Sequence, residues 1–492
     1  MEGTKKKLVL LCFLAASFSP CFAQRMTMDE AVETARRQSV AALEAKQAFI
    51  STYWAWRSYK ASRLPSLYFY GNVMNYNRSL VLLQSYEDGS LRYAATNNLQ
   101  NSLGLQLKQN ITFTGGTISV YSDLSRIDQF GLNKKLSWYS QPITINYTQP
   151  LFAYNSFKWE KKIEPKEYEK GKRVYIEAME QITIDAVAAY NDLILAHLNN
   201  DIAKSNYEKT CRMHKVAEDR LKLGSVTRDE YLQLELRMLN DSVSINETSV
   251  KVRDAQMNLN SILGFDESAE IEPVLNENVP VLEMDYEMVL AKSLENSKFD
   301  LENEISLLNA SAAVAKAKAD RGITMSLNAR FGLSNTAPTF PGAYKSPVDQ
   351  EVAGLSFSVP IFDWGLGKGK VQKAQAAEEV VKAQVQQAEN DFRRTLFTLV
   401  GQFNNQARQC DISRRAMLIA AERYELMMAK FRDGKASVTD LNTAQSENDS
   451  AAQKYVTDIS NFWDFYYRLR KYTLYDFELN QDIGINVDEL IQ

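Results

Sequence analysis

Few residues in this 492-residue chain have the types and spacing that catalysis or ligand binding requires. Residues 365–370, GLGKGK, stand between an expected strand and an expected helix, as a phosphate-binding loop would. They lack the spacing of that loop and the Ser or Thr after its lysine. The two histidines, His197 and His214, lie 17 residues apart on one expected helix, several turns beyond what one metal ion can bridge. With no nucleophile–base pattern either, the sequence predicts neither an enzyme nor a cofactor or metal site.

Two prolines and two glycines that recur at one spacing are more informative. From Pro150 to Gly224 the interval is 74 residues, and from Pro360 to Gly434 it is 74 again. A spacing that is kept while the residues between have diverged indicates a length that the structure needs. The chain is therefore predicted to be two copies of one unit, residues 24–280 and 281–492. Each glycine, taken alone, fits an ordinary helix C-terminal stop.

Helix-forming sequence fills the interval between each proline and its glycine. We expect long helices over about 156–222 and about 368–432. A helix of more than 60 residues is roughly 90 Å long, so it must lie against other helices. Shorter helices are expected to open and close each copy, and they cover residues 27–64, 227–263, 285–321 and 437–475.

Segments that alternate apolar and polar residues precede each long helix, in residues ~66–151 and 323–361. Such segments match tilted transmembrane β-strands, although a soluble sandwich with one wet face has the same period. The export signal and the long helices favour the barrel. The first strand region contains an insertion around Gly115 and Gly116. The sequence leaves this insertion open as a surface hairpin, a longer outer loop or extra wall strands.

Residues 1–23 have the basic start, short apolar core and small-residue end of a secretory signal peptide. Lipid attachment at Cys21 is the alternative, and the preceding Phe-Ser-Pro disfavours it. After the leader only Cys211 and Cys410 remain, so a disulfide framework is not expected. The formal net charge of −4 gives no basic face for nucleic acid. No later stretch is apolar enough for a membrane-spanning helix.

The order of the expected elements resembles the TolC-type outer-membrane efflux family. In each copy a helix is followed by a strand pair, a long helix, a glycine turn and a returning helix. The resemblance covers nearly the whole mature chain and depends on the order of five short motifs. They are MDEAV at 28–32, QPLF at 149–152, VPIF at 359–362, RLKLGSV at 220–226 and FRDGKASV at 431–438.

This resemblance implies a mainly α protein with a transmembrane β-barrel portion, a homotrimer with four strands per protomer and a long periplasmic α-helical barrel. It implies a passive exit duct in the outer membrane, surrounded by lipid. An adaptor protein would connect the duct to an inner-membrane pump of a tripartite efflux system for small molecules. Type I protein or peptide secretion remains an alternative. A non-conducting coiled-coil envelope protein is an alternative of a different class, which the alternating strands disfavour.

The resemblance also implies functions for particular residues. The two glycine turns would receive the adaptor, through Leu223, Gly224, Ser225, Asp433, Gly434 and Lys435. A ring of carboxylates would narrow the tunnel just past the second turn, at Asp440, with Glu230 as its counterpart in the first copy. These two acids have an ordinary alternative role, which is to complement the helix N-terminal dipole. Pro150 and Pro360 would mark the exits from strand to helix.

Overall fold

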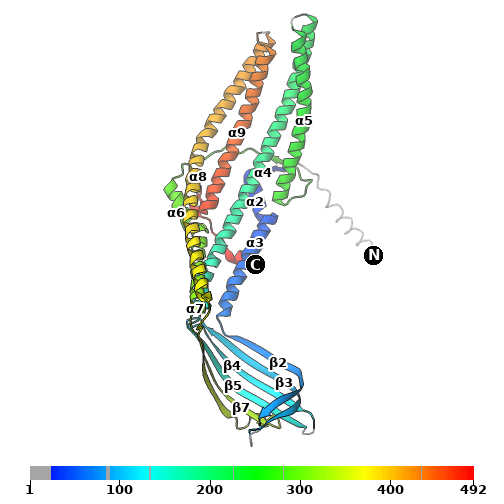
Figure 1. The fold of residues 1–492 in the computed structure, drawn as a ribbon. Coiled ribbons are helices and arrows are strands. Elements are labelled where there is room, and N and C mark those ends of the chain that lie inside the picture. Colours follow the sequence, from blue (N-terminus) through cyan, green and yellow to red (C-terminus); the bar gives the residue numbers. More distant parts are fainter. Residues whose placement is uncertain are drawn as a thin grey trace, which may run out of the picture. The chain divides into compact units, whose positions relative to one another are not determined.

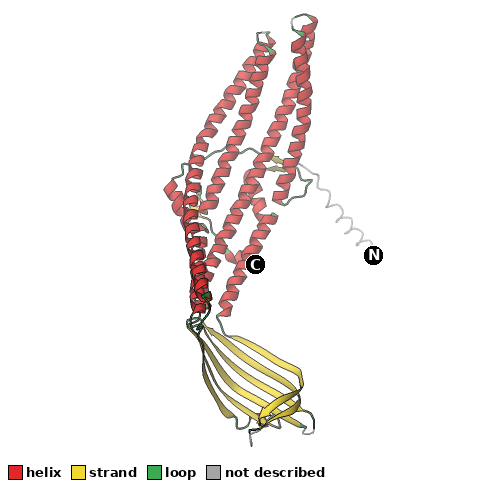
Figure 2. Cartoon of the chain, viewed as in Figure 1, coloured by secondary structure: helices red, strands yellow, loops and turns green. Residues whose placement is uncertain are grey.

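The computed structural model describes residues 24–84, 89–131, 134–224, 226–280, 282–433 and 435–491. The expected leader, with Cys21, lies outside the described residues. The chain divides into two compact units (Figures 1 and 2). The first is helical and takes in the described parts of residues 1–50, 171–300 and 389–492; the second, residues 51–170 and 301–388, contains the large sheet.

The helices of the two copies have equal lengths. Helices α4 (Ser156–Lys222) and α8 (Leu366–Arg432) each have 67 residues. Helices α5 (Arg228–Leu263) and α9 (Val438–Thr473) each have 36. These lengths agree with the equal proline-to-glycine spacing in the sequence. Both long helices contribute residues to both units.

The expected single helices over 27–64 and 285–321 are wrong, because each is two helices. The first pair is α2 (Met28–Gln38) and α3 (Val40–Ser62); the second is α6 (Tyr286–Asn296) and α7 (Phe299–Arg321). At the first break Ser39 is extended (φ −64°, ψ 152°), and its hydroxyl accepts the Ala42 N–H at 3.0 Å. Ser297 is extended at the second break. A serine hydroxyl that bonds the nearby backbone offers an alternative to continuing the helix.

A cluster of large side chains forms the core of the helical unit. Tyr190 of α4 is buried, and its hydroxyl donates to the Met26 carbonyl at 2.7 Å. Met26 ends β1 (Gln24–Met26), which pairs in parallel with β6 (Ile271–Pro273). From α9, Phe462 and Tyr466 pack on Phe403 of α8, so the C-terminal aromatic cluster is core, as its packing interpretation predicts. Cys211 and Cys410 are free thiols.

The chain after α9 forms a short tail. Helix α9 ends at Thr473, two residues before the expected end. The tail contains the two-stranded sheet of β9 (Tyr475–Asp476) and β10 (Gln481–Asp482), then α10 (Val487–Ile491).

The second unit contains a six-stranded sheet in the order β2-β3-β4-β5-β7-β8, with every neighbouring pair antiparallel. The strands are β2 (Ser66–Gln84), β3 (Leu91–Ile111), β4 (Gly116–Gln129), β5 (Lys135–Leu151), β7 (Thr324–Ala337) and β8 (Val348–Ser358). A short 3-10 turn, η2 (Gly342–Tyr344), lies between the last two.

This order resolves the insertion that the sequence left open. Strands β3 and β4 lie between β2 and β5, so the insertion adds strands inside the sheet. The sheet of one chain therefore has six strands, where the resemblance implies four per protomer. The last strand is also shorter than expected and ends at Ser358 rather than near 361. Within the described residues, no helix is both long and apolar enough to cross a membrane.

Candidate functional site

The first candidate site is the turn between α4 and α5. Gly224 has φ +72°, a left-handed conformation that favours glycine, and its N–H donates to the Leu221 carbonyl at 3.1 Å. Leu223, just before it, is 81% exposed. Ser225 lies outside the described residues. The turn therefore presents an apolar side chain to solvent.

The equivalent turn between α8 and α9 has different chemistry. The Asp433 and Lys435 side chains are exposed and form an ion pair, with 3.6 Å between Nζ and Oδ2. The Lys435 N–H donates to the Lys430 carbonyl at 2.8 Å, which closes the end of α8. Gly434 lies outside the described residues. One turn is thus apolar and the other carries paired charges.

The two expected constriction carboxylates, Asp440 and Glu230, begin the returning helices. Ser437 caps α9: its hydroxyl accepts the Asp440 N–H at 3.1 Å, and Asp440 Oδ2 accepts the Ser437 N–H at 3.2 Å. Thr227 and Glu230 form the same capping box at α5. The hydrogen bonds from Ser437 hold the pKa of Asp440 below its ordinary value, so this exposed group is an anion at neutral pH.

These capping boxes have a sequence signature, T-x-x-E at 227–230 and S-x-x-D at 437–440, which could have predicted them. Both acids therefore lie in the first turn of a helix, where a negative charge complements the helix dipole, which is the alternative role considered from the sequence. Asp440 is exposed to solvent and Glu230 is half-buried, so both carboxylates can still be reached from solvent.

A groove between α4 and α8 lies close to these turns and was not predicted. It encloses about 740 Å³. Four cations and one acid line it, together with apolar side chains: Lys209, Arg212, Arg220, Arg432, Glu425, Met213, Val216, Tyr424, Met428 and Phe431. Lys209 Nζ lies 4.6 Å from the centre of the Tyr424 ring. The groove is therefore both basic and apolar.

The two prolines expected at the strand-to-helix exits differ in their positions, since one lies within a strand and the other lies after a strand. Pro150 is the second-to-last residue of β5 and pairs with Ser326. Pro360 lies after β8, before α8 begins at Leu366. Between Pro360 and α8, the Asp363 carboxylate accepts hydrogen bonds from the N–H groups of Gly365 (2.9 Å) and Gly367 (2.7 Å).

These two hydrogen bonds explain the glycine-rich run at 365–370. The backbone N–H groups that would hold a phosphate are already bound to Asp363, and they keep the pKa of that carboxyl below its ordinary value. Gly365 has φ +86°, which favours glycine at this turn. The run is a capped joint between strand and helix.

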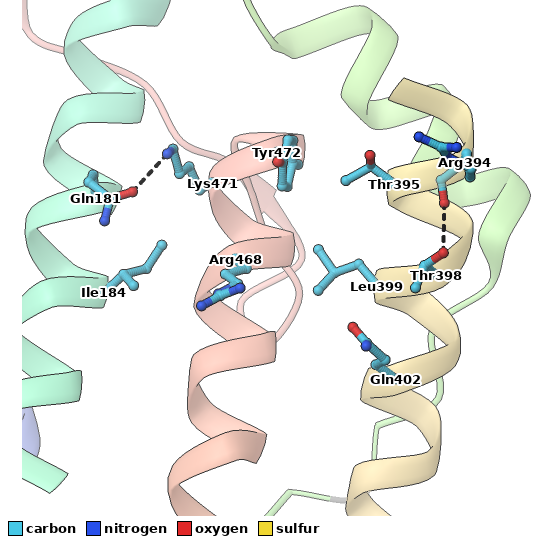
Figure 3. A pocket seen from close by; sticks show the side chains of 10 residues that line it. All are labelled: Gln181, Ile184, Arg394, Thr395, Thr398, Leu399, Gln402, Arg468, Lys471 and Tyr472. Atoms are coloured by element: carbon cyan, nitrogen blue, oxygen red, sulfur yellow. Dashed lines mark hydrogen bonds between the residues drawn. The ribbon is translucent and has the colours of Figure 1, made fainter. Parts of the chain in front are cut away.

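A second pocket, of about 450 Å³, lies among α4, α8 and α9 (Figure 3). Three cations line it, and each has a partner: Lys471 donates to Gln181 at 2.7 Å, Arg468 pairs with Asp464, and Arg394 pairs with Asp391. Because these partners account for the cations, we assign no ligand to this pocket.

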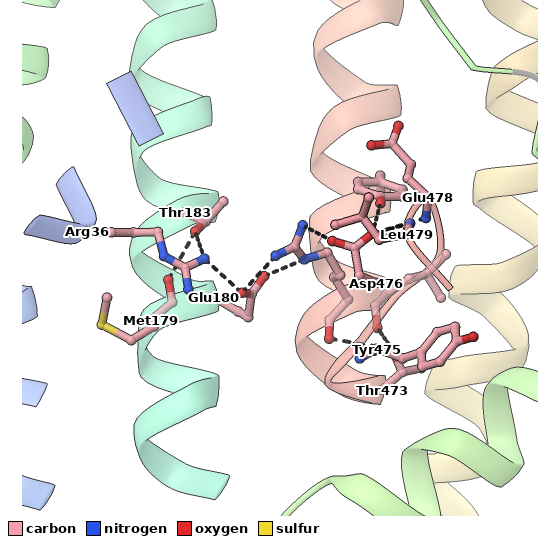
Figure 4. Close-up of polar contacts among 12 residues, drawn as sticks. Arg36, Met179, Glu180, Thr183, Thr473, Tyr475, Asp476, Glu478 and Leu479 are labelled. Carbon is pink, nitrogen blue, oxygen red and sulfur yellow. Dashed lines mark hydrogen bonds and ion pairs between the residues drawn. The ribbon is translucent and has the colours of Figure 1, made fainter. Parts of the chain in front are cut away.

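Near this pocket a fully buried carboxylate, Glu180 of α4, joins three segments (Figure 4). Arg36 of α2 donates to it at 3.0 Å, and Arg470 of α9 donates at 2.9 and 3.3 Å. Arg470 also pairs with Asp476 at 3.0 Å. This network was not predicted, since acids on the long helices were expected to lie on solvated faces or in helix pairs.

Among the described residues, no group of three or more His, Cys, Asp or Glu side chains is arranged so that it could hold a metal ion. The His214 ring packs 4.7 Å from the Tyr231 ring, centre to centre.

Comparison with known proteins assigns the class. Residues 290–472 match the family model described as Outer membrane efflux protein. A comparison with curated proteins gave no match.

Solved channels share the fold over most of their length. VceC of Vibrio cholerae has a TM-score of 0.63 at 14% identity, over 93% of this chain and 97% of that one. CmeC of Campylobacter jejuni gives 0.62 at 14%, over 94% and 88%, and MtrE of Neisseria gonorrhoeae gives 0.58 at 13%, over 93% and 91%. At these identities the likeness shows the fold.

The family model supports an outer-membrane efflux protein, and the solved structures show that the chain shares the fold of outer-membrane channels. The match to the outer membrane efflux protein family covers residues 290–472, which is less than half of the chain. The resemblance seen in the sequence is confirmed, as are the mainly α fold class with its sheet and the outer-membrane location.

Proposed function

We propose that this protein is the homotrimeric exit duct of a tripartite efflux pump. It conducts small molecules passively from a periplasmic adaptor and an inner-membrane transporter to the exterior, and its helical unit lies in the periplasm. The family and fold support a channel, and surface features of the helical unit support the assembly.

The observation that carries the assembly is an exposed apolar stripe on each of two helices. On α5 it recurs in heptad steps and is 42–68% exposed: Leu232, Leu236, Leu239, Val243, Val250 and Met257. On α8, Ile412, Ile419 and Leu426 recur every seven residues and are 52–66% exposed. Apolar residues at this spacing form the seam of a coiled coil.

The neighbours of these helices indicate what covers the stripes. Within one chain, α4 contacts α5 through Thr210 and Asp241, and α9 contacts α4 through Asn206 and Asp449. Helix α9 also contacts α8, where Cys410 donates to Asp458. A ring that repeats the order α5, α4, α9, α8 places α5 of one copy against α8 of the next. A second copy of this chain is therefore the occupant that both stripes fit.

The adaptor is proposed to dock at the two turns, at Leu223, Gly224 and Ser225 and at Asp433, Gly434 and Lys435. The groove between α4 and α8 extends this surface and adds a net positive charge. It suits a helical partner with acidic and apolar side chains. Replacing Lys209 with Glu should weaken adaptor copurification, while Lys204→Glu, exposed on the same helix outside the groove, should not. Equal losses in both variants would remove the groove from the docking surface.

Asp440, with Glu230 as its counterpart, is proposed to line the tunnel constriction. Threefold symmetry would bring three copies of each anion together at a narrow mouth. Convergent negative charges there favour cations and repel anions.

Conductance of the purified protein in a planar bilayer tests the channel directly. We expect ion current from the trimer and a larger current from a variant opened at the turns. A complete absence of current, even from the opened variant, would support a non-conducting coiled-coil protein instead. Type I secretion remains the second candidate, and export of a protein substrate through the reconstituted system would favour it.

A further inference from the structure

The two inserted strands have the dimensions of membrane-spanning strands. A transmembrane strand needs about 9–11 residues at a tilt of ~45°. Strands β3 and β4 have 21 and 14 residues, and the shortest of the six, β8, has 11. Every strand of the sheet is therefore long enough to cross a bilayer.

The inserted strands also continue the two faces of the sheet. One row of register partners runs Leu67, Leu107, Val120, Ile145 and Phe331, from β2 to β7, and is apolar throughout. Four of these side chains are 42–69% exposed.

The adjacent row, on the opposite face, runs Lys108, Ser119, Asn146 and Arg330 and is polar. Ser119 and, further along this polar face, Thr144 are buried. Lys108 and Arg330 of the polar row are exposed. An exposed apolar row opposite a polar row matches a wall between lipid and a wet lumen.

Side-chain contacts fix the inserted strands in this wall. Tyr70 of β2 crosses over Gly104 of β3, and its hydroxyl donates to Asp123 of β4 at 2.5 Å. A Cβ at Gly104 would lie 2.7 Å from the Tyr70 ring, so glycine permits the crossing. At the turn between β3 and β4, Asn155 donates to the Phe113 carbonyl at 3.1 Å and Gln149 to the Thr114 carbonyl at 2.9 Å.

The edges of the sheet are β2 and β8. Because the sheet is antiparallel throughout and has an even number of strands, its two edge strands run in opposite directions. Strand β8 of one copy can therefore pair in antiparallel fashion with β2 of another. Lipid demands such pairing, because it leaves no water to bond the backbone groups of an open edge.

We infer that each protomer supplies six strands to the shared wall, so that three copies close an eighteen-stranded barrel. This inference depends on the trimer of the proposed function and replaces the twelve strands that the family resemblance implies. With strands ~4.8 Å apart and tilted ~40°, the backbone diameter is roughly 35 Å, against roughly 24 Å for twelve strands. Barrels of 16–18 strands hold an aqueous channel, so the outer opening admits bulky hydrated cargo.

Electron cryomicroscopy of the full-length protein in lipid nanodiscs tests the strand count directly. We expect eighteen strands in the barrel cross-section. A trimer with twelve strands, and with residues 91–129 outside the wall, would overturn this inference and leave the exit duct intact. A protein that is not trimeric would overturn the proposed function itself.

Disulfide crosslinking in native membranes provides a second test, in a background lacking Cys211 and Cys410. The register partners Tyr68 and Gln106, both replaced by Cys, should form a bond within one chain, because β2 pairs with β3. Tyr68→Cys combined with Ser356→Cys in β8 should give covalent trimers, since it spans the seam between copies. Each single-cysteine variant is the control.

A bond between Tyr68→Cys and a cysteine at Asn146 in β5, in place of the Gln106 bond, would mean that β3 and β4 are excluded from the wall. That result would overturn the eighteen-stranded barrel and leave the proposed trimer unaffected.

Discussion

The buried Glu180 network gives the sharpest test of what holds the helical unit together. Arg470→Met removes one of two cations that face a carboxylate with no solvent exposure. With charge centres ~4 Å apart and an effective dielectric constant of ~20, the lost attraction is about 4 kcal/mol. Breaking a buried pair by removing one partner typically costs about 3–5 kcal/mol, which agrees.

Thermal unfolding followed by circular dichroism at 222 nm measures this loss. At about 2 °C per kcal/mol for a unit of this size, the melting temperature should fall by roughly 8 °C. Scans at one fixed rate are compared, because unfolding of a large assembly is often irreversible. Arg468→Met on the same helix is the matched control. Its partner Asp464 is partly exposed, so the melting temperature should change by about 1 °C or less.

A second substitution identifies the cause. Adding Glu180→Gln to Arg470→Met removes the buried negative charge that has lost one of its two cations, so the double variant should melt at a higher temperature than Arg470→Met alone. Arg36 can still donate to the glutamine. If Arg470→Met melts within about 1 °C of the wild type, or if Glu180→Gln deepens its loss, the carboxylate does not organise this unit.

Three further predictions concern the turns and one half-buried acid. Asp440→Ala should weaken channel block by multivalent cations, whereas Ser437→Ala, which loses the cap but keeps the carboxylate, should not; equal block in both would exclude Asp440 from the constriction. Gly224→Val should reduce adaptor copurification with trimers intact, and Gly224→Asn should retain most of it, because asparagine tolerates φ +72°; similar losses would mean that backbone conformation is not the cause. Burial raises the pKa of Asp449, although the hydrogen bond from Asn206 acts in the opposite direction. Above this raised pKa the charged carboxylate destabilises the fold, and the penalty is lost as the pH falls below the raised pKa. Asp449→Asn should therefore raise the melting temperature at pH 7 and do so progressively less in acid; a gain that is constant with pH would contradict the burial argument.

The long helices were predictable because their signals are local. Helix formers fill both intervals between punctuating residues, and the returning helices begin at cap signatures such as S-x-x-D at 437–440. The breaks at Ser39 and Ser297 were missed, since a lone serine is common inside helices and only its hydrogen bonds reveal the break.

Other features depended on residues far apart in the chain. The alternation in β3 and β4 was visible, but their place between β2 and β5 follows from pairing that no local pattern encodes. Glu180 looked like a solvated acid, since its partners lie 144 and 290 residues away. The candidate turns were located from the repeated spacing, and their proposed role came from the resemblance. The differing chemistry of Leu223 and the Asp433–Lys435 pair became visible only in the structure.

The equal helix lengths set a symmetry that the sheet does not share. Residues 210 apart are equivalent in α4 and α8, yet the first copy supplies four strands and the second only two. In the proposed trimer the helical part is therefore nearly sixfold, while the strands can be only threefold. A partner at the turns meets six nearly equivalent positions that alternate between an exposed leucine and an ion pair. The partner could bind at all six positions or, if it recognises only one of the two kinds of turn, at every second position.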